Sequence, residues 1–385
     1  MRPERDSVGT VEDLHASATR LTGLENFGSD EYRDGLAVLL DSYARDAGLT
    51  SLGRKLKRVF LRGALVARLL SEAAWRAHPG YAETGIERPI FVTGLPRTGT
   101  TALHRLLTAD PAHQGLEMWL TEAPQPRPPR ATWAADPVFR QIQAGYEQHH
   151  IEHPEFTGVH YIAADQVEEC WQLLRQSMRS IAYECLAHLP SYSSWLRGQD
   201  WTDAYRRHRR NLQLIGMPDR DRRWVLKNPS HLFALDALLR VYPDALVIQT
   251  HRAPRTAIAS VCSLAEQASA GWSTTFRGEV IGRDQLELWA FGLERFTAVR
   301  ARHDPAQFCD VDYDDFVADP LGTVESTYAY FGLPLSGTAA DAMRALHGQS
   351  ATGGARSAHR YTLADFGLTG EEIDERFGGH QRAHA

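Results

Sequence analysis

The sequence predicts an α/β fold of the P-loop NTPase-like kind, a three-layer sandwich with a central parallel sheet and a helical N-terminal extension. Residues 1–88 have helical periodicity, whereas from residue 89 short apolar strands alternate with amphipathic helices. Such alternation is typical of parallel sheets that helices cover on both faces. The first apolar run also leads directly into a glycine-rich turn and a helix, a strand–turn–helix unit typical of this fold class.

The first 88 residues are predicted to form a helical extension. One buried helix face follows the i, i+3, i+4, i+7 pattern through Leu36, Leu39, Leu40 and Tyr43. A second stripe runs from residue 52 to residue 75, and the turn at 78–80 ends it. No residue type here indicates chemistry, so we interpret 1–88 as a packing element and 89–385 as the α/β domain.

The elements of the α/β domain follow from its apolar runs. A sheet of four or five strands is expected, with strands at 89–93, 224–226, 245–250 and 308–311. Helices are expected at 102–107, 165–190, 201–217, 232–242, 254–268, 286–302 and 320–331. Residues 121–160 are rich in proline and histidine, which predicts a long surface excursion that is helical only in pieces.

Composition and charge exclude several classes of protein. The net charge is −6, and no basic block with interleaved aromatic residues occurs, so nucleic acid is not an expected partner. The apolar runs are too short for a membrane span, and the first 17 residues lack the apolar core of a signal peptide. We therefore expect a cytoplasmic protein with no transmembrane segment. The oligomeric state stays open.

Cysteine spacing indicates no metal centre. The four cysteines do not pair at the spacing of metal ligands, and no Cys/His run accompanies them, so reduced thiols and no bound metal are expected.

Residues 94–101 (GLPRTGTT) form the glycine-rich turn before the first helix of the domain. The N–H groups at a helix start lack intrahelical partners, and the helix dipole adds about half a positive charge there. Gly94 and Gly99 have the G-x-x-x-x-G spacing of the Walker A loop, but two threonines follow Gly99 where that motif has Lys and then Ser or Thr. Arg97 lies inside the loop instead. The turn therefore suits a single 5′-phosphate group better than a nucleoside triphosphate with magnesium.

This octapeptide resembles the 5′-phosphosulfate loop of sulfotransferases that use 3′-phosphoadenosine-5′-phosphosulfate (PAPS). It is most similar to the bacterial branch related to tyrosylprotein sulfotransferases, which has G-x-P-R-[ST]-G-T-T. The resemblance covers residues 88–370. It implies transfer of a sulfuryl group from PAPS to a hydroxyl group, with adenosine 3′,5′-bisphosphate as product and no metal. The loop residues that it assigns to the nucleotide are Arg97, Thr98, Gly99, Thr100 and Thr101, and Arg97 is also assigned to catalysis.

A second phosphate site is expected at the end of the strand 245–250. Arg252 follows that strand, at the sheet edge where α/β proteins bind ligands, and Ser260 lies eight residues later on the next helix. In the family, an Arg and a Ser at this spacing bind the 3′-phosphate, and Arg offers paired donors to a phosphate. One nucleotide with two phosphate groups needs both sites.

Lys227 is the candidate that stabilises the leaving group. Lysine makes up only three of the 42 basic residues, and Lys227 is the only one after residue 57. It follows a strand, so it is expected at the same sheet edge as the phosphate loops. The resemblance places a Lys near the bridging oxygen, where charge builds as the sulfur–oxygen bond breaks.

Glu117 is the candidate general base. The related branch has a Glu at this distance from its loop, and the apolar neighbours of Glu117 provide surroundings that raise a carboxyl pKa. His160, His231 and the pair 168–169 stay as alternatives, the pair being interpreted as acceptor-side or structural. Arg356 is a looser candidate for a nucleotide contact.

Aspartates at 310 and 312 imitate a Walker B motif but have no matching Walker A lysine.

The acceptor is expected to be a small, hydrophobic molecule with a hydroxyl group, framed by 121–160 and 269–283, because the long loops carry Trp119, Trp133, Trp171, Trp272 and Phe276. A P-loop kinase and a non-catalytic nucleotide-binding protein are the rival interpretations, and the missing Walker lysine disfavours the kinase.

Overall fold

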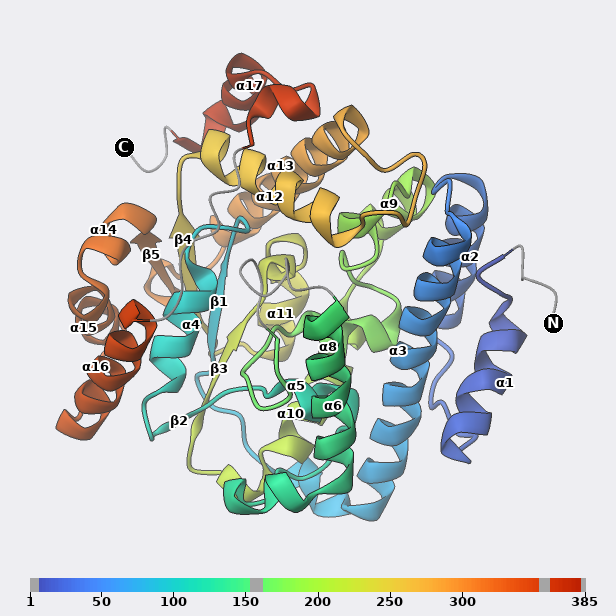
Figure 1. Cartoon of the computed structure of the whole chain (residues 1–385). Coiled ribbons are helices and arrows are strands. Elements are labelled where there is room, and N and C mark those ends of the chain that lie inside the picture. Colours follow the sequence, from blue (N-terminus) through green and yellow to red (C-terminus); the bar gives the residue numbers. More distant parts are fainter. Residues whose placement is uncertain (1–6, 153–161, 353–360, 382–385) are drawn as a thin grey trace.

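The computed structural model describes residues 7–152, 162–352 and 361–381. At its centre lies a five-stranded sheet in the order β2-β3-β1-β4-β5 (Figure 1). All neighbouring strands are parallel, which confirms the predicted α/β class. The strands are β1 (Ile90–Gly94), β2 (His113–Gln114), β3 (Arg223–Lys227), β4 (Leu246–His251) and β5 (Phe308–Asp312). The sequence did not reveal β2, because two residues carry no periodicity.

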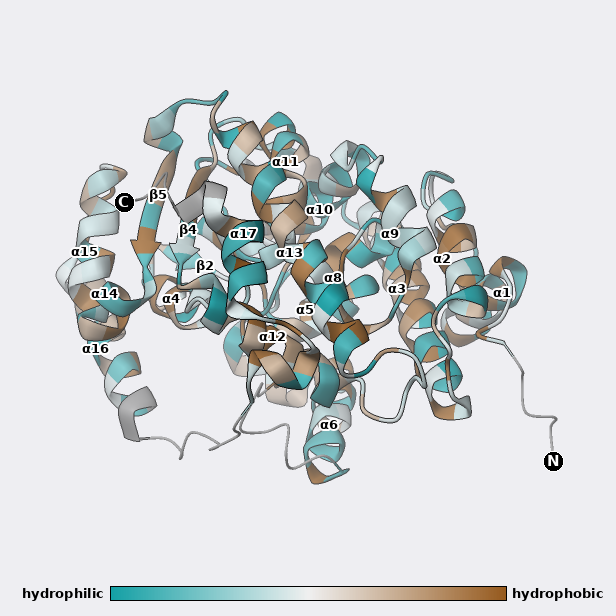
Figure 2. Ribbon diagram, turned by 90° about the horizontal axis from the view of Figure 1, so that it is seen from above, coloured by the Kyte–Doolittle hydropathy of each residue, from teal (hydrophilic) through white to brown (hydrophobic). Residues whose placement is uncertain are grey.

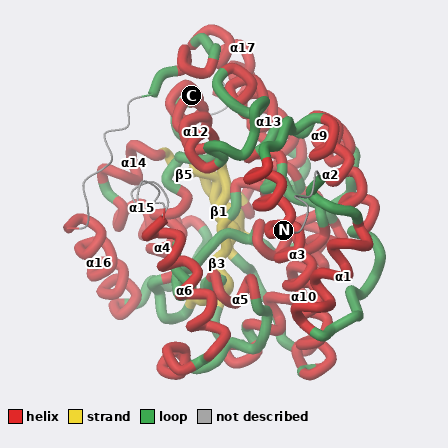
Figure 3. The backbone as a smooth tube through the Cα atoms, turned by 45° about the vertical axis from the view of Figure 1, so that its right-hand side comes forward, coloured by secondary structure: helices red, strands yellow, loops and turns green. Residues whose placement is uncertain are grey.

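Each face of the sheet has its own apolar core. Side chains alternate between the faces along a strand, so Ile90 and Val92 join one cluster while Phe91 joins the other. The cluster of Ile90 is closed by α4 (Thr100–Thr108), α15 (Pro320–Tyr330) and α16 (Gly337–Thr352). The cluster of Phe91 is closed by four helices between residues 202 and 300, whose bounds are given below. Figure 3 shows the strands between these helical layers, and the predicted three-layer sandwich is confirmed.

The remaining helices complete the layers. They are α5 (Met118–Glu122), α6 (Pro137–Glu152), α8 (Trp171–Leu174), α9 (Pro190–Arg197), α10 (Thr202–Ile215), α11 (Leu235–Val241), α12 (Pro254–Ala268), α13 (Glu279–Arg300), α14 (Tyr313–Ala318) and α17 (Gly370–Gln381). The helix expected at 254–268 is confirmed in full. The helix expected at 165–190 is wrong: this stretch contains only α8 and two short 3-10 turns, and the left-handed backbone of Met178 (φ 53°) interrupts it.

The N-terminal residues form α1 (Val11–Thr22), α2 (Arg33–Arg45) and α3 (Ser51–Ala77), as the helical periodicity predicted. Seen from above, they lie at the opposite end of the molecule from α14 to α16 (Figure 2). Their buried side chains belong to the same cluster as Phe91, so the extension continues the core of one sheet face. The turn before α3 also holds the segment 269–283, because Thr50 N–H donates to Trp272 O over 3.0 Å and Thr274 N–H donates to Gly48 O over 2.9 Å.

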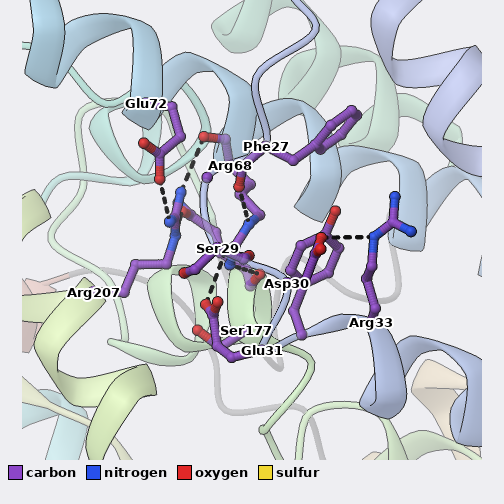
Figure 4. Close-up of polar contacts among 12 residues, drawn as sticks. Phe27, Ser29, Asp30, Glu31, Arg33, Arg68, Glu72, Ser177 and Arg207 are labelled. Atoms are coloured by element: carbon purple, nitrogen blue, oxygen red, sulfur yellow. Dashed lines mark hydrogen bonds and ion pairs between the residues drawn. The ribbon is translucent and has the colours of Figure 1, made fainter.

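A buried arginine on α3 binds the turn that connects α1 to α2 (Figure 4). The guanidinium of Arg68, fully buried on α3, donates to the carbonyl oxygens of Phe27 and Ser29 over 2.6 Å, and also to Glu31 over 2.9 Å. Arg207 on α10 in turn donates to the Arg68 carbonyl over 3.0 Å. These bonds give the buried guanidinium of Arg68 its hydrogen-bond partners.

Replacing Arg68 with Met is expected to destabilise the fold by about 2–3 kcal/mol, because three carbonyl or carboxylate acceptors lose a charged donor and Glu31 loses its cation. The midpoint of urea-induced unfolding measures this loss. Arg33→Met is the matched control, since the Arg33–Asp30 pair is exposed and such pairs contribute little. Equal midpoints for the two variants would contradict a structural role for Arg68.

Candidate active site

The turn between β1 and α4 has the backbone of an anion cradle. Gly94 (φ 146°), Arg97 (φ 70°) and Gly99 (φ 86°) all have positive φ angles. A Cβ on Gly94 would lie 2.5 Å from the carbonyl oxygen of Thr250, so only glycine fits there. Gly99 precedes the first turn of α4 without a capping side chain, which leaves the N–H groups of that turn available to an anion.

The side chains of the cradle have different tasks. Thr98 is buried, and its hydroxyl donates to Leu95 O over 2.6 Å and lies 2.5 Å from the Thr250 hydroxyl. Thr98 therefore fixes the loop and offers only its backbone N–H to a ligand. Arg97 is exposed, and its Nε donates to the Ser260 hydroxyl over 3.2 Å. Its left-handed φ in a non-glycine residue is strained, as is common at functional sites.

The second predicted phosphate site touches the first. Arg252 lies just beyond β4 and donates to the carbonyl oxygen of Arg97 over 2.9 Å. Its guanidinium stacks 4.0 Å from the ring centre of Tyr313, which orients its remaining donors. Ser260, on α12, bonds to Arg97 as described above. The structure thus brings Arg97, Arg252 and Ser260 together at one edge of the sheet.

Lys227 ends β3 at the same edge. Its side chain is 1% exposed, and its Nζ donates to the Thr101 hydroxyl over 3.1 Å. The second partner of Nζ is the Glu169 carboxylate, at 2.5 Å. The sequence left Glu169, as part of the pair 168–169, among the alternative bases and favoured an acceptor-side or structural role for that pair. The lone lysine was the available signal, because a buried ammonium requires a carboxylate nearby.

The Glu117 carboxylate has an arginine as its partner. Its carboxylate accepts a hydrogen bond from Arg127 Nε over 3.1 Å, and Arg127 also binds Asp219 and Gln114. Burial raises the pKa of the Glu117 carboxyl, although Arg127 opposes the shift. The pair lies in a cavity of about 550 Å³ that residues preceding β3 help to line, namely Pro218, Asp219 and Arg222. The cavity therefore reaches the amino end of β3, and it is also lined by Val167, with which Glu117 forms an antiparallel β-bridge.

The candidate histidine in the described chain is a core residue. The ring of His231 is buried, and its Nδ1 shares a 2.7 Å hydrogen bond with the Tyr205 hydroxyl. Burial holds the pKa of His231 well below its usual value. His160 and Arg356 lie outside the described residues.

The aspartates near β5 have structural partners. Asp312 caps α14 by accepting the N–H of Asp314 over 2.7 Å. Asp310 binds Arg300 and His251. Burial alone would raise the pKa of the Asp310 carboxyl, but these two hydrogen bonds outweigh burial and lower the pKa. Among residues 7–152, 162–352 and 361–381, no group of three or more His, Cys, Asp and Glu side chains is arranged to hold a metal ion. In the same part of the chain, no helix is long and apolar enough to cross a bilayer.

The aromatic residues expected near the acceptor include both core residues and accessible ones. Trp119, Trp133 and Phe276 are buried in the core. Trp171 is half-buried, two residues beyond Glu169, and Trp272 packs 4.8 Å from the ammonium of Lys57. Residues 121–152, the described part of the segment 121–160, are helical in pieces, as predicted, with α6 as the longest piece.

A second cavity, of about 470 Å³, lies between α9 and α13 and contains Glu184. Burial raises the pKa of Glu184 to about 7, from an ordinary value of 4.5. Its folded-state pKa is thus higher than its unfolded value, so its contribution to stability is full below pH 4.5 and is lost as the pH rises through 7.

Relative to Glu184→Gln, the wild-type protein is expected to lose about 2 kcal/mol of unfolding free energy between pH 5 and pH 8. Urea unfolding of both proteins at the two pH values measures the difference. Parallel pH dependence in the two proteins would contradict a protonated Glu184 in the folded state.

Comparison with known proteins shows which protein family this chain is similar to. The sequence model described as the sulfotransferase family matches residues 89–337. The crystal structure of the sulfotransferase STF1 from Mycobacterium tuberculosis H37Rv is 60% identical over 97% of this chain and 100% of its own, with a TM-score of 0.92. That of the sulfotransferase STF9 from Mycobacterium avium is 27% identical over 98% of this chain and 97% of its own, with a TM-score of 0.88.

A curated relative is the omega-hydroxy-beta-dihydromenaquinone-9 sulfotransferase Stf3 of Mycobacterium bovis. It is 26% identical over 266 residues, which are 66% of this chain. The match spans 65% of the length of that relative.

Proposed function

The chain belongs to the sulfotransferase family, and on that premise we propose that it transfers a sulfuryl group from PAPS to a hydroxyl group of a hydrophobic small molecule. The observation that carries this proposal is the contact between the two anion sites. Arg97 bonds to Ser260 through its side chain and to Arg252 through its carbonyl. Two adjacent cradles suit a nucleotide that carries phosphate groups on both sides of one ribose.

Each cradle has a separate part in binding. The open N–H groups before α4, with Arg97, Thr100 and Thr101, bind the 5′-phosphosulfate. Arg252 and Ser260 bind the 3′-phosphate, and Arg356 is retained as a further proposed nucleotide contact. No metal is proposed, because the loop has Thr100 where a magnesium–triphosphate site has its lysine.

The chemistry is an in-line displacement at sulfur. The acceptor oxygen attacks the sulfur, and the bond between the sulfur and the bridging oxygen breaks, so that charge collects on the 5′-phosphate. Lys227 reaches the phosphate loop through its hydrogen bond to Thr101, and it donates a hydrogen bond to the bridging oxygen as the bond from that oxygen to sulfur breaks. Arg97 donates to the transferring group from the other side of the loop. A carboxylate takes the proton of the acceptor hydroxyl, and Glu117 is the residue that the family resemblance suggests.

The acceptor class follows from the relatives and the accessible aromatic residues. The name of the curated relative describes a sulfotransferase acting on a hydroxylated dihydromenaquinone. Trp171 is half-buried and follows Glu169 by two residues, so that an apolar acceptor that reaches Glu169 would lie near it. We propose a hydroxylated lipid or polycyclic acceptor, and a reducing compartment such as the cytoplasm, since all four cysteines are unpaired.

Transfer of labelled sulfate from PAPS tests the proposal. The purified protein is incubated with ³⁵S-labelled PAPS and hydroxylated quinones, sterols or phenols, and labelled product is separated by chromatography. Time-dependent labelling of a hydroxylated apolar acceptor, but not of its methyl ether, is expected. Binding of neither PAPS nor its product would contradict the proposal.

A further inference from the structure

The structure places one carboxylate directly beside the proposed leaving-group lysine, and that carboxylate is Glu169. The Glu169 Oε1 atom lies 2.5 Å from Lys227 Nζ, and Nζ lies 3.1 Å from the Thr101 hydroxyl on the phosphate loop. One lysine thus joins Glu169 to the site where the 5′-phosphosulfate is proposed to bind. Glu117 instead binds Arg127, in the cavity that reaches the amino end of β3.

The backbone fixes Glu169 in this position. Its neighbour Cys170 donates its N–H to the Lys227 carbonyl oxygen over 3.1 Å, and Glu168 donates its N–H to Leu116 O over 2.8 Å. The Glu168 carboxylate accepts the N–H of Glu169 over 3.0 Å. Hydrogen bonds on both sides of a residue restrict its movement, so Glu169 is held at the carboxyl end of β3 before any ligand binds.

Exposure separates the two members of the pair. The Lys227 side chain is 1% exposed, whereas that of Glu169 is 20% exposed. A molecule approaching from solvent therefore meets the carboxylate before the ammonium. This is the arrangement that a general base requires, because the acceptor hydroxyl must come within hydrogen-bond distance of it.

We propose that Glu169 is the general base of the sulfuryl transfer and that, in the free enzyme, it holds Lys227 until the donor binds. This inference rests on the proposed function. The phosphosulfate competes with Glu169 for the ammonium, and Lys227 turns to the bridging oxygen. The freed carboxylate then takes the proton of the acceptor hydroxyl as the acceptor oxygen bonds to sulfur. The electron pair of the broken S–O bond remains on the 5′-phosphate, Lys227 donates a hydrogen bond to it, and Glu169 returns its proton to solvent.

The proposal predicts two effects of opposite sign for Glu169→Gln. Removing the carboxylate frees Lys227 and removes a negative charge near the 5′-phosphate, so adenosine 3′,5′-bisphosphate is expected to bind about three- to tenfold more tightly. Removing the base is expected to lower kcat by about 10²- to 10⁴-fold. A residue with a merely structural role would weaken binding and turnover together.

Calorimetric titration with adenosine 3′,5′-bisphosphate and turnover with labelled PAPS test both effects. Glu184→Gln is the matched control, because Glu184 lies in the other cavity, between α9 and α13. Its kcat is expected to stay within about fivefold of wild type, well short of the loss from removing a base. Glu117→Gln is measured beside it to compare the two candidate bases, and its loss of turnover is expected to be smaller than that of Glu169→Gln. Unfolding curves verify that each variant is folded, and Glu169→Asp, which keeps a carboxylate, is expected to recover part of the lost turnover.

Three results would overturn the proposal: Glu169→Gln retaining turnover within fivefold, Glu169→Gln binding the bisphosphate more weakly than wild type, or Glu117→Gln showing the larger loss of turnover. Failure of the proposed function is distinguishable from these, because the wild-type protein would then neither bind the bisphosphate nor transfer sulfate.

Discussion

Lys227→Met is expected to lower kcat for sulfuryl transfer by about 10³-fold, because one preorganised donor to a developing oxyanion contributes that much in a water-poor site. The side chain is buried at the carboxyl end of β3 and reaches the phosphate loop through Thr101. Methionine keeps the volume and removes the charge. Binding of the bisphosphate product should also weaken, which is the opposite of the effect expected for Glu169→Gln.

The control for Lys227→Met is Lys55→Met, the same exchange at an exposed position of α3. Its turnover should match wild type. Steady-state kinetics with labelled PAPS and single-turnover measurements separate the chemical step from product release. A Lys227→Met enzyme with unchanged single-turnover rate would remove Lys227 from the chemistry.

Arg252→Ala is expected to weaken binding of adenosine 3′,5′-bisphosphate by about 10²- to 10³-fold, since truncating one partner of a charge-assisted contact costs several kcal/mol. Adenosine 5′-monophosphate lacks the 3′-phosphate, so its affinity should change far less. The variant is therefore expected to lose the ability to distinguish the two nucleotides.

The matched control is Arg255→Ala, three residues further along the same segment. Arg255 is exposed and pairs with Asp374, so its removal should leave both affinities unchanged. Arg252→Lys keeps the charge but loses the planar stacking on Tyr313 and should give an intermediate affinity. Equal losses for both nucleotides would place Arg252 in a general role for the loop rather than at the 3′-phosphate.

Much of the fold could be predicted from local sequence patterns. Buried parallel strands are short apolar runs, and helices such as α12 are bounded by clear signals, so their positions agree with the structure. The stretch 165–190 has the apolar pattern of a helix, although its apolar residues pack in the core from α8 and two short 3-10 turns. Burial and helical periodicity produce similar patterns over such short distances.

The parts of the candidate site that depend on backbone conformation could be predicted from the sequence. The parts that depend on which charged side chains pair with each other could be predicted less well. The glycine spacing between residues 94 and 101 predicts a turn, and the structure has that turn. The partners of Lys227 and Glu117 are set by long-range contacts, with Glu169 and Arg127 respectively. Sequence alone does not reveal which carboxylate faces which cation.

Isothermal titration calorimetry with adenosine 3′,5′-bisphosphate, beside ATP and magnesium, tests the central claim most directly. If the adjoining sites of Arg97 and Arg252 bind the two ends of one nucleotide, the bisphosphate should bind at one site per chain, at least about 100-fold more tightly than ATP with magnesium, a difference of about 2.7 kcal/mol. Tight binding of ATP with magnesium and no binding of the bisphosphate would contradict the account.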